Sequence, residues 1–147
     1  ITTFLDFFRL PNDFPNYGLE CRNIDAIEEG IKSDLGYERL VPYIQKYEFE
    51  TLLFVSMDGF NLLLDDRGQL DQIQEIIDSY ANVEDINGGV ETAPSKRLSR
   101  IFNYNKVADS GLVLDELDVE TMRKKCPRFD KWIEKLIGII QSVANAN

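Results

Sequence analysis

The stretch from Tyr43 to Phe54, YIQKYEFETLLF, constrains the fold more than any other part of the sequence. It is apolar at both ends, yet Glu48 and Glu50 lie two positions apart within it. An apolar run that ends in acids is typical of a core strand that delivers carboxylates to the rim of a sheet, where open α/β sheets bind ligands. On a strand the two glutamates would share one face, whereas on a helix they would diverge by about 200°. Both alternatives stay open for residues 48–57.

A second apolar run, from Thr2 to Phe8, contains the acid Asp6. Aromatic and β-branched residues dominate this run, so we expect a buried strand. A carboxylate in such a run is costly unless it is paired or holds a cation, so Asp6 either caps a turn at the strand's end or belongs to a site. A further strand is expected within Glu38 to Tyr47, where Pro42 must lie at a start, a bulge or an edge.

Helical periodicity dominates the rest of the chain, so we expect a single α/β domain with a small sheet and a largely helical C-terminal half. Ile24, Ile27, Ile31 and Leu35 repeat at helical spacing and are followed by the stop signal Gly36. Further helices are predicted over 70–80, from Pro94, after an N-cap at Asp118, and after Pro127. Turns, loops or connectors are predicted over 9–19, at Asp58-Gly59, and over 65–68, 83–92 and 103–111.

Residue composition excludes several kinds of chemistry. The chain has no histidine, which rules out a Ser-His-Asp triad and leaves little basis for a zinc site. Cys21 and Cys126 form no CxxC pattern, so reduced cytoplasmic thiols are expected. No apolar run approaches the roughly 20 residues that span a bilayer, and no membrane partner is expected. Any metal would be held by oxygen, which favours magnesium, manganese or calcium.

Charge is unevenly distributed along the chain. The 16 basic and 26 acidic residues give a net charge of −10, and all of the excess acid lies in residues 1–91. This balance argues against tight binding of nucleic acid by an evenly charged surface alone. It does not argue against a contact bridged by a metal ion, or against binding aided by the basic residues of the last third of the chain. At the helix that starts with Pro94, the first-turn amides with Lys96 and Arg97 would attract an anion, unless they are merely an exposed helix start.

The strongest candidate site is an oxygen-rich divalent-metal site formed by Asp6 with Glu48, Glu50 or both. Mg²⁺ keeps several of its waters, so two or three acids at neighbouring strand ends suffice. A metal held there would activate water or stabilise charge on a phosphate group. Lys96 or Lys106 would add charge stabilisation in phosphoryl transfer. We therefore take these five residues as candidate catalytic residues, and the three acids as candidate ligands of Mg²⁺ or Mn²⁺.

Five sequence runs identify a resemblance to a known family. They are TTFLDFFRLPNDFP, VPYIQKYEFETLLF, INGGVETAPSKRL, YNKVADSG and RKKCPRFDKWIEKL, in this order and over nearly the whole chain. Together they resemble the RloG-like family of bacterial proteins, catalogued as a domain of unknown function and related to TOPRIM domains. The TAPSKR and CPxFxxW segments are the most specific.

The resemblance implies a TOPRIM-like α/β fold over residues 1–147, with a small, mostly parallel sheet flanked by helices. It also implies a bacterial cytoplasmic protein, encoded near an ATPase or near restriction and phage-defence genes. TOPRIM nucleases bind magnesium through a glutamate after the first strand and a DxD pair after a later one. Asp6 resembles the first acid of that pair, and the second falls on Phe8. Glu50, or else Glu48, resembles the later acid, and Lys96 or Lys106 the lysine of related nucleases.

Two functional hypotheses follow from this resemblance. In the first, the protein is a magnesium-dependent nuclease component that acts with an ATPase partner on nucleic acid in phage defence. The first-strand glutamate has no counterpart and the sequence starts without methionine, so we expect a fragment that lacks its N-terminal strand or strands and is inactive alone. In the alternative, the chain is a catalytically degenerate interaction module with an exposed apolar patch, on the last helix. A second copy of the chain is a further candidate partner.

Overall fold

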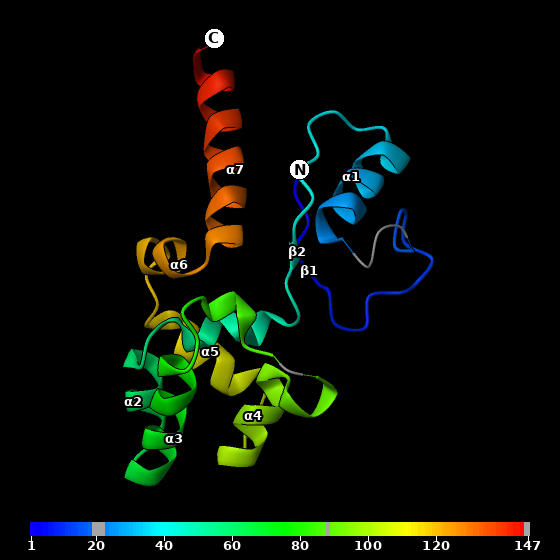
Figure 1. Ribbon diagram of the computed structural model, residues 1–147. Helices are drawn as coiled ribbons and strands as arrows, with labels where there is room; N and C mark the ends of the chain where they lie inside the picture. The colour runs from blue at the N-terminus through cyan, green and yellow to red at the C-terminus, as the bar shows by residue number, and fades with distance from the viewer. Residues whose placement is uncertain (19–22, 88, 146–147) are drawn as a thin grey trace. The chain divides into compact units, whose positions relative to one another are not determined.

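The computed structural model describes residues 1–18, 23–87 and 89–145 (Figure 1). The chain divides into two compact units. Unit 1 comprises Ile1–Lys46 and Lys131–Asn147, and unit 2 comprises Tyr47–Asp130. Among the described residues, both strands lie in unit 1, and unit 2 is helical. The protein is therefore an α/β protein that is mostly helical and has a small sheet.

Unit 1 contains a parallel pair of strands, β1 (Leu5–Asp6) and β2 (Ile44–Gln45). Leu5 pairs with Ile44 and Asp6 with Gln45, and an isolated parallel bridge joins Thr2 to Val41. The parallel pairing agrees with the predicted sheet, but both strands are much shorter than the runs predicted for them. Beyond the paired residues, Arg9 and Tyr47 adopt left-handed φ values of 60° and 69°, so the chain is no longer extended at these two positions.

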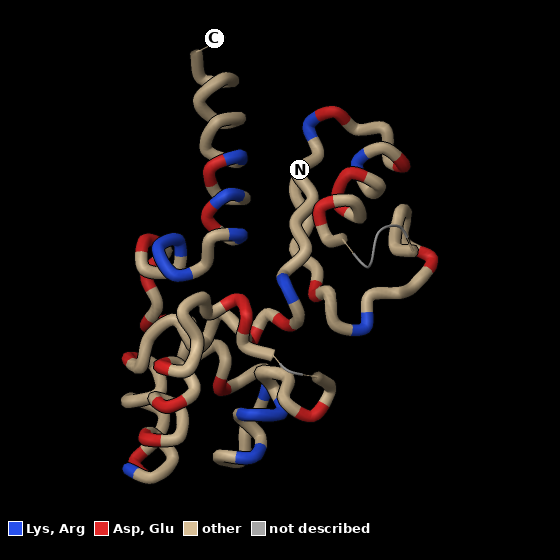
Figure 2. The backbone as a smooth tube through the Cα atoms, in the orientation of Figure 1, with Lys and Arg blue, Asp and Glu red and all other residues tan. Residues whose placement is uncertain are grey.

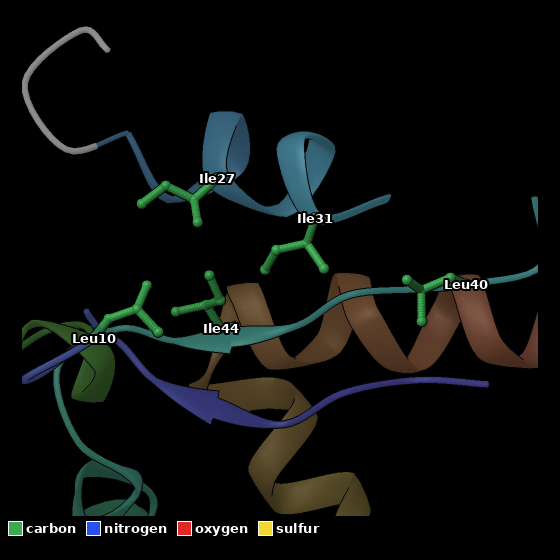
Figure 3. Close-up of a cluster of buried hydrophobic side chains, with 5 residues drawn as sticks. All are labelled: Leu10, Ile27, Ile31, Leu40 and Ile44. Atoms are coloured by element: carbon green, nitrogen blue, oxygen red, sulfur yellow. The ribbon is translucent and has the colours of Figure 1, made fainter. Parts of the chain in front are cut away.

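Helix α1 (Ile24–Leu35) covers the strand pair and completes the core of unit 1. Asn23 caps it by accepting hydrogen bonds from the amides of Asp25 and Ala26. At the other end Gly36 adopts a left-handed φ of 58°, which confirms the predicted stop. Figure 3 shows Ile27 and Ile31 of α1 pointing toward the strand β2, which carries Ile44. The cluster consists of Leu10, Ile27, Ile31, Leu40 and Ile44.

The last helix, α7 (Pro127–Asn145), begins in unit 2 and belongs to unit 1 from Lys131 onward. Its Trp132 ring stacks on Tyr43, with ring centroids 4.7 Å apart. The Trp132 indole N–H also donates a hydrogen bond of 2.8 Å to the Thr2 hydroxyl. Trp132 therefore ties α7 to both strand segments of unit 1.

Unit 2 consists of short helices packed around a buried 3-10 helix, η1 (Phe49–Val55). Residues 50–55 of η1 are all buried, because the run TLLF supplies an almost unbroken apolar sequence. The two alternatives left open for residues 48–57 are thus resolved in favour of a short helix. The other elements of unit 2 are α2 (Asp58–Leu63), α3 (Arg67–Asp78), η2 (Val83–Asp85), η3 (Val90–Thr92), α4 (Pro94–Ile101), α5 (Ala108–Asp115) and α6 (Val119–Lys125).

Side-chain hydrogen bonds to backbone amides accompany the helix starts that replace predicted turns in unit 2. The turn expected at Asp58-Gly59 is the start of α2, because the Ser56 hydroxyl accepts a hydrogen bond from the Asp58 amide. The connector expected over 103–111 is shorter than predicted, because α5 begins within it at Ala108. The Asn105 side chain accepts hydrogen bonds from the amides of Val107 and Ala108 at this start. The turn expected over 65–68 is shortened in the same way, since Asp66 caps α3.

The other helix signals of unit 2 are confirmed. Pro94 lies in the first turn of α4, and Asp118 caps α6 by accepting from the Thr121 amide at 2.8 Å. Among its described residues, which leave out position 88, the predicted loop over 83–92 contains only the short 3-10 helices η2 and η3. Cys21 and Leu19 fall outside the described residues. Within the described part of the chain, no helix is long and apolar enough to cross a membrane.

Candidate carboxylate–lysine site

The first turn of η1 places Glu50 inside unit 2, where its side chain has no exposed surface. The ammonium of Lys106 lies 2.9 Å from Glu50 Oε1 and donates to Oε2 at 3.2 Å. Lys106 precedes α5 in a short turn, and its ammonium also lies 4.9 Å from the centre of the Phe49 ring. A buried carboxylate and a half-exposed lysine thus form an ion pair across 56 positions of sequence.

The surroundings of Glu50 favour its neutral form. Burial raises the pKa of the Glu50 carboxyl above its usual value of 4.5, and the negative charge of Glu48 raises this pKa further. The hydrogen bond and positive charge of Lys106 act in the opposite direction and only partly offset the burial. Burial, with the charge of Glu50, likewise raises the pKa of the nearby Tyr104 phenol. A second positive charge in this cluster would stabilise the ionised carboxylate.

Glu48, which immediately precedes η1, binds the start of α4. Its Oε2 accepts a hydrogen bond from the Ser95 amide at 3.0 Å, and its Oε1 accepts one from the Ser95 hydroxyl at 3.0 Å. The sequence left open whether this helix start attracts an anion or is merely an exposed helix start, and in the structure the Ser95 amide donates to a carboxylate of the chain itself. Glu48 and Glu50 therefore differ in their direct partners. Glu48 contacts a helix terminus, and Glu50 contacts a lysine.

The predicted site residues fall into two groups. Glu48, Glu50 and Lys106 all belong to unit 2, where the charges of Glu48 and Lys106 both act on Glu50. Lys96 is exposed on the first turn of α4, directly after the Ser95 that holds Glu48. Asp6 belongs to unit 1, where it ends β1. Its part in a shared site stays a prediction from the sequence.

Sequence reasoning missed two contributors to this region. Ser95 supplies both hydrogen bonds to Glu48 across 47 positions, and no local pattern relates the two residues. Glu84, which is buried, accepts from the amides of Arg128 and Phe129 in the first turn of α7, at 2.8 and 3.1 Å. The unit thus uses two internal glutamates as anions at helix starts.

The chemistry of the donors suits a hard divalent cation, although the donors are already engaged. Among the described residues, no group of three or more acids, cysteines or histidines is gathered in a way that could hold a metal ion. Mg²⁺ commonly takes only one or two carboxylates and keeps its remaining ligands as water. Glu50, with Glu48 nearby, supplies this number. Metal binding at Glu50 requires the Lys106 ammonium to move aside, because it now occupies the carboxylate oxygens.

The fold and this cluster define an α/β protein with a two-stranded parallel sheet and a buried carboxylate–lysine pair. Residues 1–137 match the family model described as Domain of unknown function (DUF4276), and the chain belongs to this family. No curated protein and no solved structure gives a significant match. The RloG-like and TOPRIM relationships go beyond this match and stay predictions from the sequence motifs.

Proposed function

We propose that the protein is the TOPRIM-like component of a divalent-metal-dependent nuclease that acts with an ATPase partner in bacterial phage defence. The observation that supports this most is the fully buried Glu50 paired with the half-exposed Lys106. A buried ion pair is weak evidence for stability, since apolar residues of similar volume often serve as well. A carboxyl with a burial-raised pKa beside a specific charged partner is a common feature of functional sites.

The residues of unit 2 have separate roles in this proposal. Glu50 is the principal metal ligand, with Glu48 as the nearby second carboxylate. When bound, Mg²⁺ or Mn²⁺ would supply Lewis-acid stabilisation of a phosphate group and an activated water. With its ion pair to Glu50 broken, Lys106 would supply positive charge that stabilises the charge developing on a phosphate. Lys96 is the alternative lysine, and Asp6 is assigned as a further ligand from the sequence, by its place in the first apolar run and by the resemblance.

Metal binding gives the first test, because it needs no substrate and no partner. We expect Mn²⁺ to bind the wild-type chain in a calorimetric titration and Glu50→Gln to lose that binding. Glu91→Gln is the matched control, since Glu91 is an exposed glutamate of the same unit that pairs with Arg100. A wild-type chain that takes up no Mn²⁺ at millimolar concentration, or equal losses for both variants, would contradict the proposal.

Lys106 gives the second test, since the proposal separates its effect on binding from its effect on cleavage. Lys106→Met frees the Glu50 oxygens, so Mn²⁺ affinity should be retained or increased. Cleavage of phosphodiester substrates by the assembled protein and its ATPase partner should fall by about 10²- to 10³-fold, as when one charge-stabilising group is removed from an active site. A variant with unchanged cleavage would remove Lys106 from the proposed mechanism.

A second candidate function, a protein-interaction module without catalysis, is favoured by the outer face of α7. Ile137, Ile140 and Val143 follow one another at three-residue spacing and are all exposed. In this alternative, Ile140→Asp abolishes phage defence, whereas Asp6→Ala and Glu50→Gln leave it intact. The opposite pattern of losses supports the nuclease.

A further inference from the structure

A groove between α3 and α4 is formed by residues that take no part in the carboxylate–lysine site. It has a volume of about 620 Å³ and is formed entirely within unit 2. This size falls within the range of about 300–1,000 Å³ typical of ligand sites. The groove is lined by Gln72, Glu75, Ile76, Ser79, Tyr80, Arg97, Arg100 and Ile101.

Arg97 is held in a fixed position at the α4 side of this groove. Its Nε donates to the Thr92 carbonyl at 2.8 Å, and its Nη2 donates to the Tyr80 hydroxyl at 2.9 Å. The guanidinium also lies 5.7 Å from the centre of the Tyr80 ring, within the range of a cation–π contact. A guanidinium fixed in this way loses little further freedom when an anion binds to it.

Arg100 follows three residues later, so it lies on the same side of α4 as Arg97. Its Nη2 lies 2.8 Å from Oε2 of Glu91, and both side chains are exposed. An ion pair between two exposed side chains is weak, so an incoming phosphate can replace Glu91 at little cost. Two arginines on one helix face can both donate to the oxygens of a phosphate, Arg97 through its remaining N–H groups and Arg100 in place of its contact with Glu91. Figure 2 shows basic residues on α4, while α3 carries several acids.

The remaining lining residues favour a ligand with more than a phosphate. Ile76 and Ile101 give the groove an apolar part, and Glu75 adds a carboxylate. A carboxylate repels a bare phosphate ion but accepts hydrogen bonds from ribose hydroxyls and from the amino groups of bases. The groove thus has cationic groups for a phosphate, apolar side chains for a base, and a carboxylate for a ribose hydroxyl or a base amino group. A nucleotide unit carries all of these parts.

We propose that the α3–α4 groove binds a nucleotide unit, with its phosphate on Arg97 and Arg100 and its sugar or base toward Glu75 and the two isoleucines. A free nucleotide and a nucleic-acid strand both carry this chemistry. In the second case the groove extends the proposed nuclease function, because it would hold the substrate backbone. The groove shares no residue with the metal site, so each can fail without the other.

The test measures binding in EDTA, where no divalent metal contributes. The probes are a fluorescein-labelled single-stranded 12-mer followed by anisotropy, and AMP and inorganic phosphate followed by calorimetry. The variants are Arg100→Glu and, as a matched control, Arg67→Glu. Arg67 is an exposed arginine of α3 that pairs with Asp71, so its reversal changes the net charge equally without touching the groove.

We expect Arg100→Glu to weaken binding of the 12-mer or of AMP about tenfold or more, the effect of losing one charge-assisted hydrogen bond. Arg67→Glu should change it less than twofold. Tighter binding of the 12-mer than of AMP supports a strand site, and equal or tighter binding of AMP supports a free-nucleotide site. Wild-type protein that binds neither probe, equal effects of the two reversals, or inorganic phosphate that binds as tightly as AMP would overturn the proposal.

Discussion

The ammonium of Lys106 lies 2.9 Å from Oε1 of Glu50, and the two side chains differ sharply in exposure, at 53% for the lysine and 0% for the glutamate. Solvent thus hydrates one end of the ion pair and not the other. Most of the desolvation cost therefore falls on the carboxylate, which is why burial outweighs the lysine in setting the pKa of Glu50.

Removing the lysine should leave a buried acid without its partner. We expect Lys106→Met to lower the free energy of unfolding by about 1–3 kcal/mol at pH 7, the cost of an unsatisfied buried polar group. The measurement is urea denaturation followed by circular dichroism. The double variant Lys106→Met with Glu50→Gln should recover part of the loss, because the amide removes the stranded charge. A double variant as unstable as the sum of the two single changes would contradict this account.

The raised pKa of Glu50 predicts a specific dependence of stability on pH. Between its usual value of 4.5 in the unfolded chain and its higher pKa in the folded protein, the folded state binds more protons than the unfolded state. Glu50 therefore contributes stability at low pH that is lost as the pH rises through the folded pKa. Urea titrations over this window should show the wild-type free energy of unfolding falling relative to that of Glu50→Gln. A wild-type free energy of unfolding that rises with pH relative to that of Glu50→Gln would contradict the raised pKa of Glu50.

Glu84 should matter more for stability than any exposed acid of unit 2. Glu84→Ala leaves the Arg128 and Phe129 amides without this acceptor at the start of α7, where Phe129 is buried, and we expect a loss of about 1–3 kcal/mol. Glu91→Ala, which removes only an exposed ion pair, should cost less than about 1 kcal/mol. Thermal denaturation of the two variants measures the difference, and similar melting temperatures would remove Glu84 from this role.

Trp132 gives a spectroscopic probe of unit 1, since it is the chain's only tryptophan. Thr2→Val removes the acceptor of the indole N–H, so we expect a shift in tryptophan emission and a loss of about 1 kcal/mol. Ser142→Ala serves as a control, because that hydroxyl donates to a carbonyl within the exposed part of α7. Unchanged emission in Thr2→Val would show that the bond does not form in solution.

Helix boundaries were predicted best where the signal is local. Gly36 marks the end of α1, and Pro94 and Asp118 mark the starts of α4 and α6. The structure confirms all three boundaries. The strands were predicted too long, because apolar content indicates burial but does not reveal how many of the residues pair with a neighbouring strand. The helix starts at Asp58 and Ala108 were missed although the hydrogen bonds of Ser56 and Asn105 to the amides at these starts are local, since both segments look like turns in sequence.

The site was harder to predict than the helices, because its contacts are long-range. The sequence singled out Glu48 and Glu50 as acids in an apolar run, and both are buried; Lys106 was one of two candidate lysines. Nothing in the sequence relates Glu48 to Ser95, 47 positions away, or Glu84 to Phe129, 45 positions away. Such pairs depend on how the helices pack, which short-range periodicity does not specify.

The different partners of the internal glutamates have a consequence for how this family can evolve. Glu48 and Glu84 satisfy helix amides, so selection for a stable fold alone would keep acids at both positions, whether or not either touches a substrate. The pair of Glu50 and Lys106 is under no such constraint, because two apolar residues could fill the same space without loss of stability. Drift would therefore tend to erase this pair in any lineage that no longer uses it. Its persistence among relatives would record selection for activity.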